Sequence, residues 1–406
     1  MSRSTDAGHF FQTTAALSET ARKSKKSKNK SGNPIKLPSK ILALCADPDD
    51  DGAIYAAEAA GTPGGEELKL INGQTGTISD SYRPNTSQLA PLTCLAVGGK
   101  LGERKLYAGC WDKHIYCWDV GGSSATSTAT KRLSGHTDFV KAVLNISLDG
   151  KDLLVSASAD ATLIVWDPST DTRLATLKGH SRGVQALALE SIESSTENIQ
   201  YATILSGDSN REIRRWHISS TSSFEIPTTG PADAEATSLD IDPLVVHETS
   251  IYTLLFDSNL DLYTASADKS AKVLARNRNW EPDTTLPHPD FVRDIAIDEQ
   301  GGWIITACRD EEVRVWDSGT GELHHVYSGH YEEVTGVLVL PGAKAVSVSI
   351  DGTVRQWSLK PQDLERVREA ARTEVLEEVE EKKGEKKSLM TAEEEAELAE
   401  LMDDSD

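Results

Sequence analysis

Short stretches of small and apolar residues that end in a tight polar turn recur along the chain, and a tryptophan follows most of these turns. Five of them are Ser156–Asp160, Ser206–Asn210, Thr264–Asp268, Thr306–Asp310 and Ser347–Asp351. The last residue of each lies six positions before a site that holds Trp166, Trp216, Leu274, Trp316 or Trp357. Short strands separated by turns at regular intervals predict an all-β repeat protein.

A histidine precedes each of these stretches. Glycine comes before His136, His180 and His330, whereas His247 and His288 hold the same place without it. The interval is 41 residues from His247 to His288 and 42 residues from there to His330. Together, these features resemble the WD-repeat family over residues 35–359. The resemblance implies a seven-bladed β-propeller in which each unit supplies four strands of one blade.

The recurring residue types fit a buried hydrogen-bond network. A buried indole N–H needs an acceptor, which a Ser or Thr hydroxyl can supply. The histidine would bind that hydroxyl, and the turn aspartate would orient the histidine. Three units carry the full set: His136, Ser156, Asp160 and Trp166; His288, Thr306, Asp310 and Trp316; and His330, Ser347, Asp351 and Trp357. Because a catalytic triad would not occur three times, these tetrads are predicted to stabilise the blades.

Two upstream units with weaker signals bring the expected number of blades to seven. One runs through Leu92–Trp118, with Gln88 where the histidine belongs, and the other covers about residues 41–71 without histidine or tryptophan. The last unit ends after its third strand, so its fourth strand must come from the N-terminal part of the chain. Ile35–Leu37 is the first candidate for this strand, and His9–Thr14 is the second.

Composition and charge narrow the function. The 406 residues carry a net charge of −22, and such a surface repels nucleic acid and anionic membranes. The five cysteines form no CxxC pair, and no apolar stretch is long enough for a membrane helix. With no metal-ligand cluster or phosphate loop in the sequence, we expect an intracellular protein that is not an enzyme and has neither metal nor cofactor.

Both ends of the chain differ from the repeat region. Arg22 to Lys30 is a basic run expected to be exposed and mobile within a flexible segment 1–34. It is a solubilising tail, a nuclear localisation signal or a weak tether to nucleic acid. Residues 360–406 are acidic with helical periodicity, and a capped helix is predicted around Leu398, Leu401 and Met402. This segment is a solvated tail or a helix that docks on this propeller or on a partner.

The resemblance also points to a partner-binding face. In WD-repeat proteins, the face at the turns between strands two and three often binds peptides. Its positions are the residue before the turn aspartate and the residues three and five after the histidine. The candidates are Trp111, Phe139, Lys141, Tyr252, Phe291, Arg293, Arg309 and Ile350. Aromatic anchors surrounded by positive charge predict an acidic peptide segment as the partner.

The expected function is therefore that of a scaffold or adaptor that assembles a protein complex, with the nucleus favoured over the cytoplasm. A ribosome-assembly factor that uses the basic run and a substrate receptor of a ubiquitin ligase are the alternatives. Such receptors carry Arg or Lys two residues after Trp-Asp, where this chain has Gly121, Ser169 and Gly319. That difference disfavours the receptor hypothesis.

Overall fold

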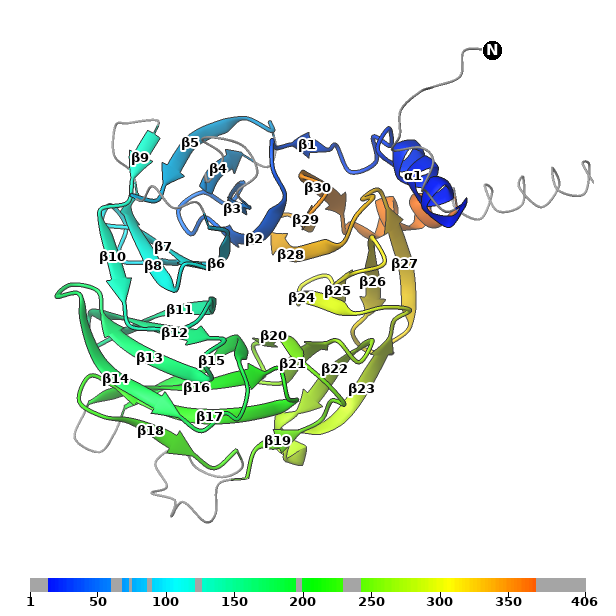
Figure 1. Cartoon of the computed structure of the whole chain (residues 1–406). Helices are drawn as coiled ribbons and strands as arrows, with labels where there is room; N and C mark the ends of the chain where they lie inside the picture. The colour runs from blue at the N-terminus through cyan, green and yellow to red at the C-terminus, as the bar shows by residue number, and fades with distance from the viewer. Residues whose placement is uncertain are drawn as a thin grey trace, which may run out of the picture. The chain divides into compact units, whose positions relative to one another are not determined.

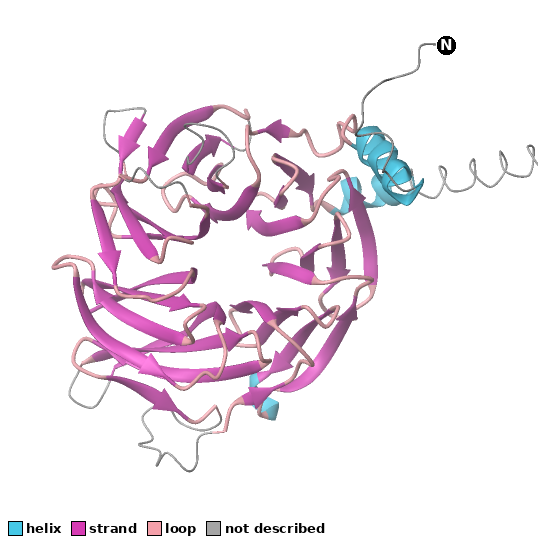
Figure 2. Cartoon of the chain, in the orientation of Figure 1, coloured by secondary structure: helices cyan, strands magenta, loops and turns pink. Residues whose placement is uncertain are grey.

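A computed structural model of the chain shows a ring of seven mainly four-stranded sheets in the part that ends at Trp357 (Figure 1). The structure describes residues 14–59, 68–72, 75–85, 90–120, 126–194, 199–228 and 242–369. Within these residues, the chain is built almost wholly from strands and the turns that join them (Figure 2). The predicted seven-bladed β-propeller is therefore confirmed.

The first two blades are the units whose sequence signals are weakest. Blade one consists of β2 (Ile41–Ala46), β3 (Ala53–Glu58), β4 (Leu68–Asn72) and β5 (Ile78–Arg83). Blade two consists of β6 (Leu92–Gly98), β7 (Lys105–Cys110), β8 (His114–Asp119) and β10 (Lys131–Ser134). A short strand from the loop of blade two, β9 (Thr126–Thr128), pairs in parallel with β5. Blade one thus gains a fifth strand from its neighbour.

Blades three and four follow with longer strands. Blade three consists of β11 (Val140–Leu148), β12 (Lys151–Ser158), β13 (Thr162–Asp167) and β14 (Thr172–Lys178). Blade four consists of β15 (Val184–Ser194), β16 (Gln200–Asp208), β17 (Glu212–Ser219), β18 (Ser223–Ile226) and β19 (Leu244–Val245). Because β18 and β19 pair with successive parts of β17, the extra residues between blades four and five interrupt an outer strand and add no blade.

The remaining blades complete the ring. Blade five consists of β20 (Ile251–Phe256), β21 (Leu262–Ser266), β22 (Ser270–Ala275) and β23 (Glu281–Pro287), with the 3-10 helix η2 (Arg276–Arg278) between the last two strands. Blade six consists of β24 (Val292–Asp298), β25 (Trp303–Cys308), β26 (Glu312–Asp317) and β27 (Leu323–Ser328). Blade seven consists of β28 (Val334–Leu340), β29 (Lys344–Ser349), β30 (Thr353–Ser358) and β1 (Ile35–Lys36).

The core lies between neighbouring blades, where one sheet packs on the next. One cluster joins Val155 of blade three to Ile204 of blade four, and another joins Val348 of blade seven to Ile54 of blade one. All four of these side chains are fully buried. Each of the seven described sheets therefore packs against the sheets on both sides of it, and the ring is a continuous stack.

The N-terminal segment closes the ring, as predicted for Ile35–Leu37. Ile35 pairs with Val354 across β1 and β30. The Leu37 N–H donates to the Gly352 carbonyl at 2.8 Å, and the Gln356 N–H donates to the Gly32 carbonyl at 2.8 Å. The other candidate, His9–Thr14, lies outside the described residues except for its last residue, which begins helix α1 (Thr14–Lys26).

The buried guanidinium of Arg355 fixes the same N-terminal segment more firmly. It donates to the carbonyl oxygens of Ser31 and Asn29. A Cβ on Gly32 would lie 2.9 Å from the ring of Trp357, and Gly32 has a φ of +71°. This close approach and this backbone conformation both require glycine.

The segment 1–34, predicted to be flexible, contains a helix in the part that the structure describes, and its mobility stays a prediction. Helix α1 contains the first half of the basic run, and its Arg22, Lys23 and Lys26 form ion pairs with carboxylates of the propeller. The reason is electrostatic: a basic run that cannot pack in an apolar core can still bind an acidic surface of the same chain.

The second unit of the chain begins at Ser358. Residues 361–369 are helical, and the Ser358 hydroxyl donates to the Asp363 carboxylate at 2.7 Å near the start of this helix. This agrees with the predicted helical periodicity after residue 360. The predicted helix around Leu398, Leu401 and Met402 lies outside the described residues.

Candidate functional site

The predicted tetrad of blade three is present. The Nδ1 atom of His136 lies 3.0 Å from the Asp160 carboxylate, and its Nε2 atom lies 2.8 Å from the Ser156 hydroxyl. The indole N–H of Trp166 donates to the same hydroxyl at 2.8 Å. His136 therefore links the turn after β12 to the tryptophan of β13, within one blade.

Blade seven repeats this geometry. The Nδ1 atom of His330 lies 3.0 Å from Asp351, its Nε2 atom lies 2.8 Å from the Ser347 hydroxyl, and Trp357 donates to that hydroxyl at 2.8 Å. Burial lowers the pKa of both His136 and His330. A neutral imidazole donates a hydrogen bond from Nδ1–H to the aspartate and accepts one at Nε2 from the hydroxyl group. Each hydrogen bond of the network therefore has a donor and an acceptor.

In blade six, the prediction is only partly correct. His288 binds the Thr306 hydroxyl at 2.8 Å, and Trp316 donates to the same hydroxyl at 2.9 Å. However, the Nδ1–H of His288 donates to the Leu286 carbonyl at 2.9 Å and does not bind Asp310. The cause is Arg314, whose guanidinium takes both oxygens of the Asp310 carboxylate.

Blade four contains a complete network that the sequence analysis missed. His180 lies 3.2 Å from Asp208 and 2.5 Å from the Ser206 hydroxyl, to which Trp216 donates at 2.7 Å. Asp208 lies two positions before Asn210, the turn residue at which the repeat pattern predicts the aspartate. Side chains two residues apart lie on the same face of a strand, and this alternation was the available signal.

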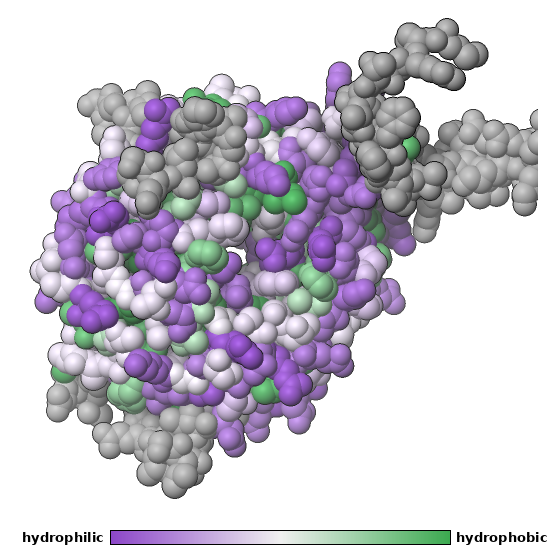
Figure 3. Space-filling model, viewed as in Figure 1, coloured by the Kyte–Doolittle hydropathy of each residue, from purple (hydrophilic) through white to green (hydrophobic). Residues whose placement is uncertain are grey.

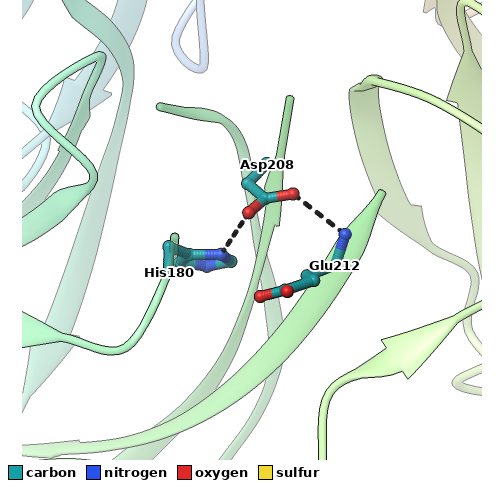
Figure 4. Close-up of side chains that lie close together, drawn as sticks. All are labelled: His180, Asp208 and Glu212. Carbon is teal, nitrogen blue, oxygen red and sulfur yellow. Dashed lines mark hydrogen bonds and ion pairs between the residues drawn. The ribbon is translucent and has the colours of Figure 1, made fainter. Parts of the chain in front are cut away.

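The same residues of blade four include a group that could hold a metal ion by its composition. His180, Asp208 and Glu212 place their ligand atoms within 4.8 Å of one another (Figure 4). Their hydrogen-bonding capacity is already used: Asp208 accepts the backbone N–H of Glu212 at 2.9 Å, and the Glu212 carboxylate pairs with Arg214. This group is therefore described best as part of the structural network.

Blades five and two show what happens when members are missing: blade five lacks the tryptophan, and blade two lacks both the histidine and the hydroxyl residue, whose place Ala108 holds. In blade five, His247 binds Asp268 at 2.8 Å and the Thr264 hydroxyl at 2.7 Å, although Leu274 replaces the tryptophan. In blade two, the Tyr116 hydroxyl donates to Asp112 at 2.6 Å in place of a histidine. The repetition of one arrangement, with substitutions that preserve hydrogen bonding, indicates a structural role in the blades.

The predicted partner-binding positions meet at one edge of each blade. The residue before the turn donates its N–H to the carbonyl of the residue three after the histidine. Ala159 pairs in this way with Phe139, Arg309 with Phe291 and Ile350 with Glu333. The two sets of positions predicted from the repeat therefore lie side by side.

Trp111 is 40% exposed and forms an aromatic stack at this edge. Its ring lies 5.2 Å from the ring of Phe139, at an interplanar angle of 17°. The ammonium group of Lys141 lies 5.6 Å from the Trp111 ring and 5.9 Å from the Phe139 ring. Burial lowers the pKa of Lys141, and the positive charge of Arg293 lowers it further.

The other predicted cations are also seated on aromatic rings. Arg293 lies 4.2 Å from the ring of Tyr252, and its guanidinium is 2.8 Å from the carboxylate of Glu333. Arg309 lies 5.0 Å from the ring of Phe291. Cation–π contacts hold these charged groups in place while leaving part of their hydrogen-bonding capacity free.

Four of the predicted residues line a cavity of about 370 Å³ along the axis of the ring, and they are Trp111, Lys141, Tyr252 and Arg293. The space-filling view shows an opening at the centre of the ring (Figure 3). Phe139 and Arg309 flank this group through their ring contacts and do not line the cavity. Ile350 is half-buried and lies outside the lining as well.

Asp294 is a cavity residue that the sequence analysis did not identify. Its carboxylate accepts the Thr253 hydroxyl of blade five at 3.0 Å and the Val337 N–H of blade seven at 2.9 Å, so it joins three blades. Burial raises the pKa of Asp294 to about 6, against the opposing effect of these hydrogen bonds. No repeat signal marks this residue, because its partners come from other blades.

Comparison with known proteins agrees with the architecture. The family model "WD domain, G-beta repeat" matches residues 127–167, 280–317 and 321–358. A WD repeat-containing protein of Schizosaccharomyces pombe, C126.01c, is 33% identical over 87% of this chain and 89% of its own length. Among the described residues, no helix is long and apolar enough to cross a membrane.

The names of more distant relatives describe a function. The nuclear distribution protein nudF of Aspergillus niger is 25% identical over 72% of this chain and 54% of its own length. The ribosome biogenesis protein WDR12 homolog of Dictyostelium discoideum is 25% identical over 62% of this chain and 60% of its own length. The matched repeats, the near full-length relative and the seven sheets agree, and this chain belongs to the WD-repeat family of β-propellers.

Proposed function

We propose that this protein is a non-catalytic scaffold that assembles a multiprotein complex through the mouth of its central channel. Propellers of this family are typically protein-interaction platforms. The observation that carries the proposal is the pair of exposed rings, Trp111 and Phe139, beneath the ammonium group of Lys141. Exposed stacked aromatic rings are typical of interface hot spots, because covering them removes a large apolar area from water.

The charges around the channel support an acidic segment as the ligand. Lys141 and Arg293 both line the cavity, and burial together with the repulsion from the positive charge of Arg293 lowers the pKa of Lys141. A carboxylate placed between them would relieve this repulsion. Because the whole chain carries a net charge of −22, an acidic ligand would be attracted to this place and repelled from most others.

Affinity purification of tagged variants from the native cells, with quantitative mass spectrometry, tests the proposal. Trp111→Ala and Lys141→Glu should each reduce recovery of the principal partners at least tenfold. The matched control is Leu174→Ala on β14, which removes a side chain that is 45% exposed on an outer strand. If all three variants recover the wild-type set of partners, the binding surface lies elsewhere.

A role in ribosome assembly is the second candidate. The name of the Dictyostelium relative and the basic run from Arg22 to Lys30 favour this role. A nuclear location belongs to this candidate, and fluorescence microscopy of a tagged chain would test it. Co-sedimentation with pre-ribosomal particles would favour this candidate, whereas partners without ribosomal components would count against it.

We also infer that the acidic C-terminal segment competes for the same face within one chain. Its predicted apolar residues Leu398, Leu401 and Met402 lie among glutamates, which is the chemistry that the channel mouth fits. A chain that ends after residue 384 should then bind the partner more tightly than the full chain. Equal affinity would assign this segment to a different surface.

A further inference from the structure

Glu311 occupies an unusual position in the repeat. It follows the turn aspartate of blade six and has a φ of +77°. The equivalent turn residues of the other clear units also have positive φ values, and they are Lys113, Ala161, Arg211, Lys269 and Gly352. Glu311 is the acidic residue of this set. The repeat therefore does not explain a carboxylate at this turn.

Helix α1 explains it, because the helix places three cations on Glu311 and its neighbours. The Arg22 guanidinium binds both oxygens of Glu311, at 2.5 and 2.6 Å. The Lys26 ammonium group lies 2.9 Å from both Glu311 and Glu312. One helical turn earlier, Lys23 lies 2.7 Å from Glu332 of blade seven. We call Glu311, Glu312 and Glu332 the acidic rim.

The acidic rim is shaped to hold cations. The Glu311 side chain is only 9% exposed beneath the helix. Burial by itself would raise the pKa of Glu311, and the hydrogen bonds from Arg22 and Lys26 outweigh burial and hold the pKa below its ordinary value. Removing the helix without replacing its cations would leave a partly buried carboxylate without its counter-ions, which is unfavourable.

The attachment of α1 depends on charge and little on apolar packing. Leu17 of the helix is 43% exposed, and Arg22 keeps a side-chain exposure of 46% while it binds Glu311. Because the cations of the helix stay in contact with water, salt screens their ion pairs with the acidic rim. A helix held in this way can leave its site, and another helix with the same spacing of cations can take its place.

We propose that the acidic rim is a binding site for a basic, helical segment of a partner protein, and that α1 occupies this site as an intramolecular competitor. The partner segment carries Arg or Lys at positions that match Arg22, Lys23 and Lys26. Binding of the partner displaces α1 and exposes the basic run from Arg22 to Lys30. The acidic rim contains none of the residues that line the central cavity, and this proposal does not rest on the function proposed for that cavity.

A fluorescent synthetic peptide with the sequence of residues 14–30 is the probe. Its binding to the full-length chain is measured by anisotropy at low and at moderate salt. In the variant Arg22→Glu with Lys26→Glu, the chain's own helix is repelled from the acidic rim. This variant should bind the peptide at least tenfold more tightly than the wild type, and added salt should weaken the binding.

Two controls make the result specific. Adding Glu311→Lys to the open variant should abolish binding of the peptide, and a peptide with glutamine in place of Arg22, Lys23 and Lys26 should not bind. Arg22→Gln with Lys26→Gln repeats the test without reversed charges, in case the first variant folds poorly. The proposal is overturned if the opened chains bind no tighter than the wild type, or if Glu311→Lys leaves binding unchanged.

Discussion

Asp310 binds Arg314 through both carboxylate oxygens, and this ion pair separates Asp310 from the histidine network of its own blade. Arg314 comes from the next strand, β26, four residues after the aspartate. Blade six therefore keeps the His288–Thr306–Trp316 part of the network, with the Leu286 carbonyl in place of the carboxylate. Two blades with the same sequence signature thus have different hydrogen bonding.

A pair of double-mutant cycles should detect this difference. In blade seven, Asp351→Ala and His330→Gln remove two groups in direct contact, so we expect a coupling energy of about 0.5–3 kcal/mol. In blade six, Asp310→Ala and His288→Gln remove groups that do not bind each other, so the two losses should add within about 0.5 kcal/mol. Urea unfolding of the seven chains, which are the wild type, four single variants and two double variants, measures both values. Equal coupling in the two blades would contradict the described geometry.

Blade four allows the stabilising effects of two nearby polar residues, Asp208 and Asn210, to be compared. Asp208→Ala removes the acceptor of His180 from a fully buried place and should cost about 1–3 kcal/mol. Asn210→Ala removes an exposed hydrogen bond to Ser181 and should cost less than about 0.5 kcal/mol. Thermal unfolding of the two variants shows which of the two side chains contributes more to stability. A larger loss for Asn210→Ala would restore the turn residue as the partner of the histidine.

Acid should destabilise the ring through its buried histidines. Burial lowers the pKa of His288 to about 4, whereas a histidine in the unfolded chain has a pKa near 6.5. Between these values the unfolded state binds more protons, so the free energy of unfolding falls as the pH falls from about 6.5 to 4. From pH 7 to pH 5, the wild type should lose about 2 kcal/mol more than His288→Gln.

The test compares the free energy of unfolding of the wild type with that of His288→Gln, because other groups titrate in the same pH range. Asp294, whose pKa is raised to about 6, has the opposite sign: its folded form binds the proton more tightly, and its contribution grows as the pH falls. Asp294 is present in both chains, so it cancels. Parallel stability curves for the wild type and His288→Gln would refute the assignment of a low pKa to this histidine.

Alanine substitutions at two glycines distinguish the cost of backbone strain from the cost of disturbing the closure of the ring. Gly102 and Gly32 both have positive φ values, but a Cβ on Gly102 meets nothing within 4 Å. Gly102→Ala should therefore lower the free energy of unfolding only by the cost of placing alanine in a left-handed conformation, about 1–2 kcal/mol. Gly32→Ala should cost about 1–3 kcal/mol more, because its Cβ would press on Trp357 where the N-terminal segment meets blade seven. Equal melting temperatures for the two variants would argue against a tight fit.

The features that repeat along the chain could be predicted from the sequence. The spacing of His136 and His330 from their turn residues predicted both the blades and the tetrads, because a repeated local pattern produces the same local contacts. Trp111 stood out as an exposed residue because it differs from its equivalents in the other units. The position of Ile35–Leu37 followed from the need for a fourth strand in the last blade.

The contacts that the sequence did not reveal involve residues outside the repeat pattern. Arg22 finds Glu311 at a separation of 289 positions, so nothing near the basic run reveals its partner. Asp310 was misassigned because a competing cation, Arg314, lies on the adjacent strand. Asp294 joins three blades, which only the assembled ring brings together. Asp208 of blade four was missed for a different reason: it lies two positions before the turn residue Asn210, on the same face of the strand.

The closure of blade seven by β1 has a consequence for biosynthesis. The carbonyl of Ser31 and the guanidinium of Arg355 are 324 positions apart in the chain, so the segment leaves the ribosome long before its partner exists. At usual rates of translation, the delay is on the order of 20–60 seconds. During this time, blade one has no neighbour on its blade-seven side, and once β30 emerges, its outer edge is open to the β1 segment of any chain nearby. Crowded nascent chains would exchange these segments, so a molecular chaperone that isolates each chain should raise the yield of closed monomers.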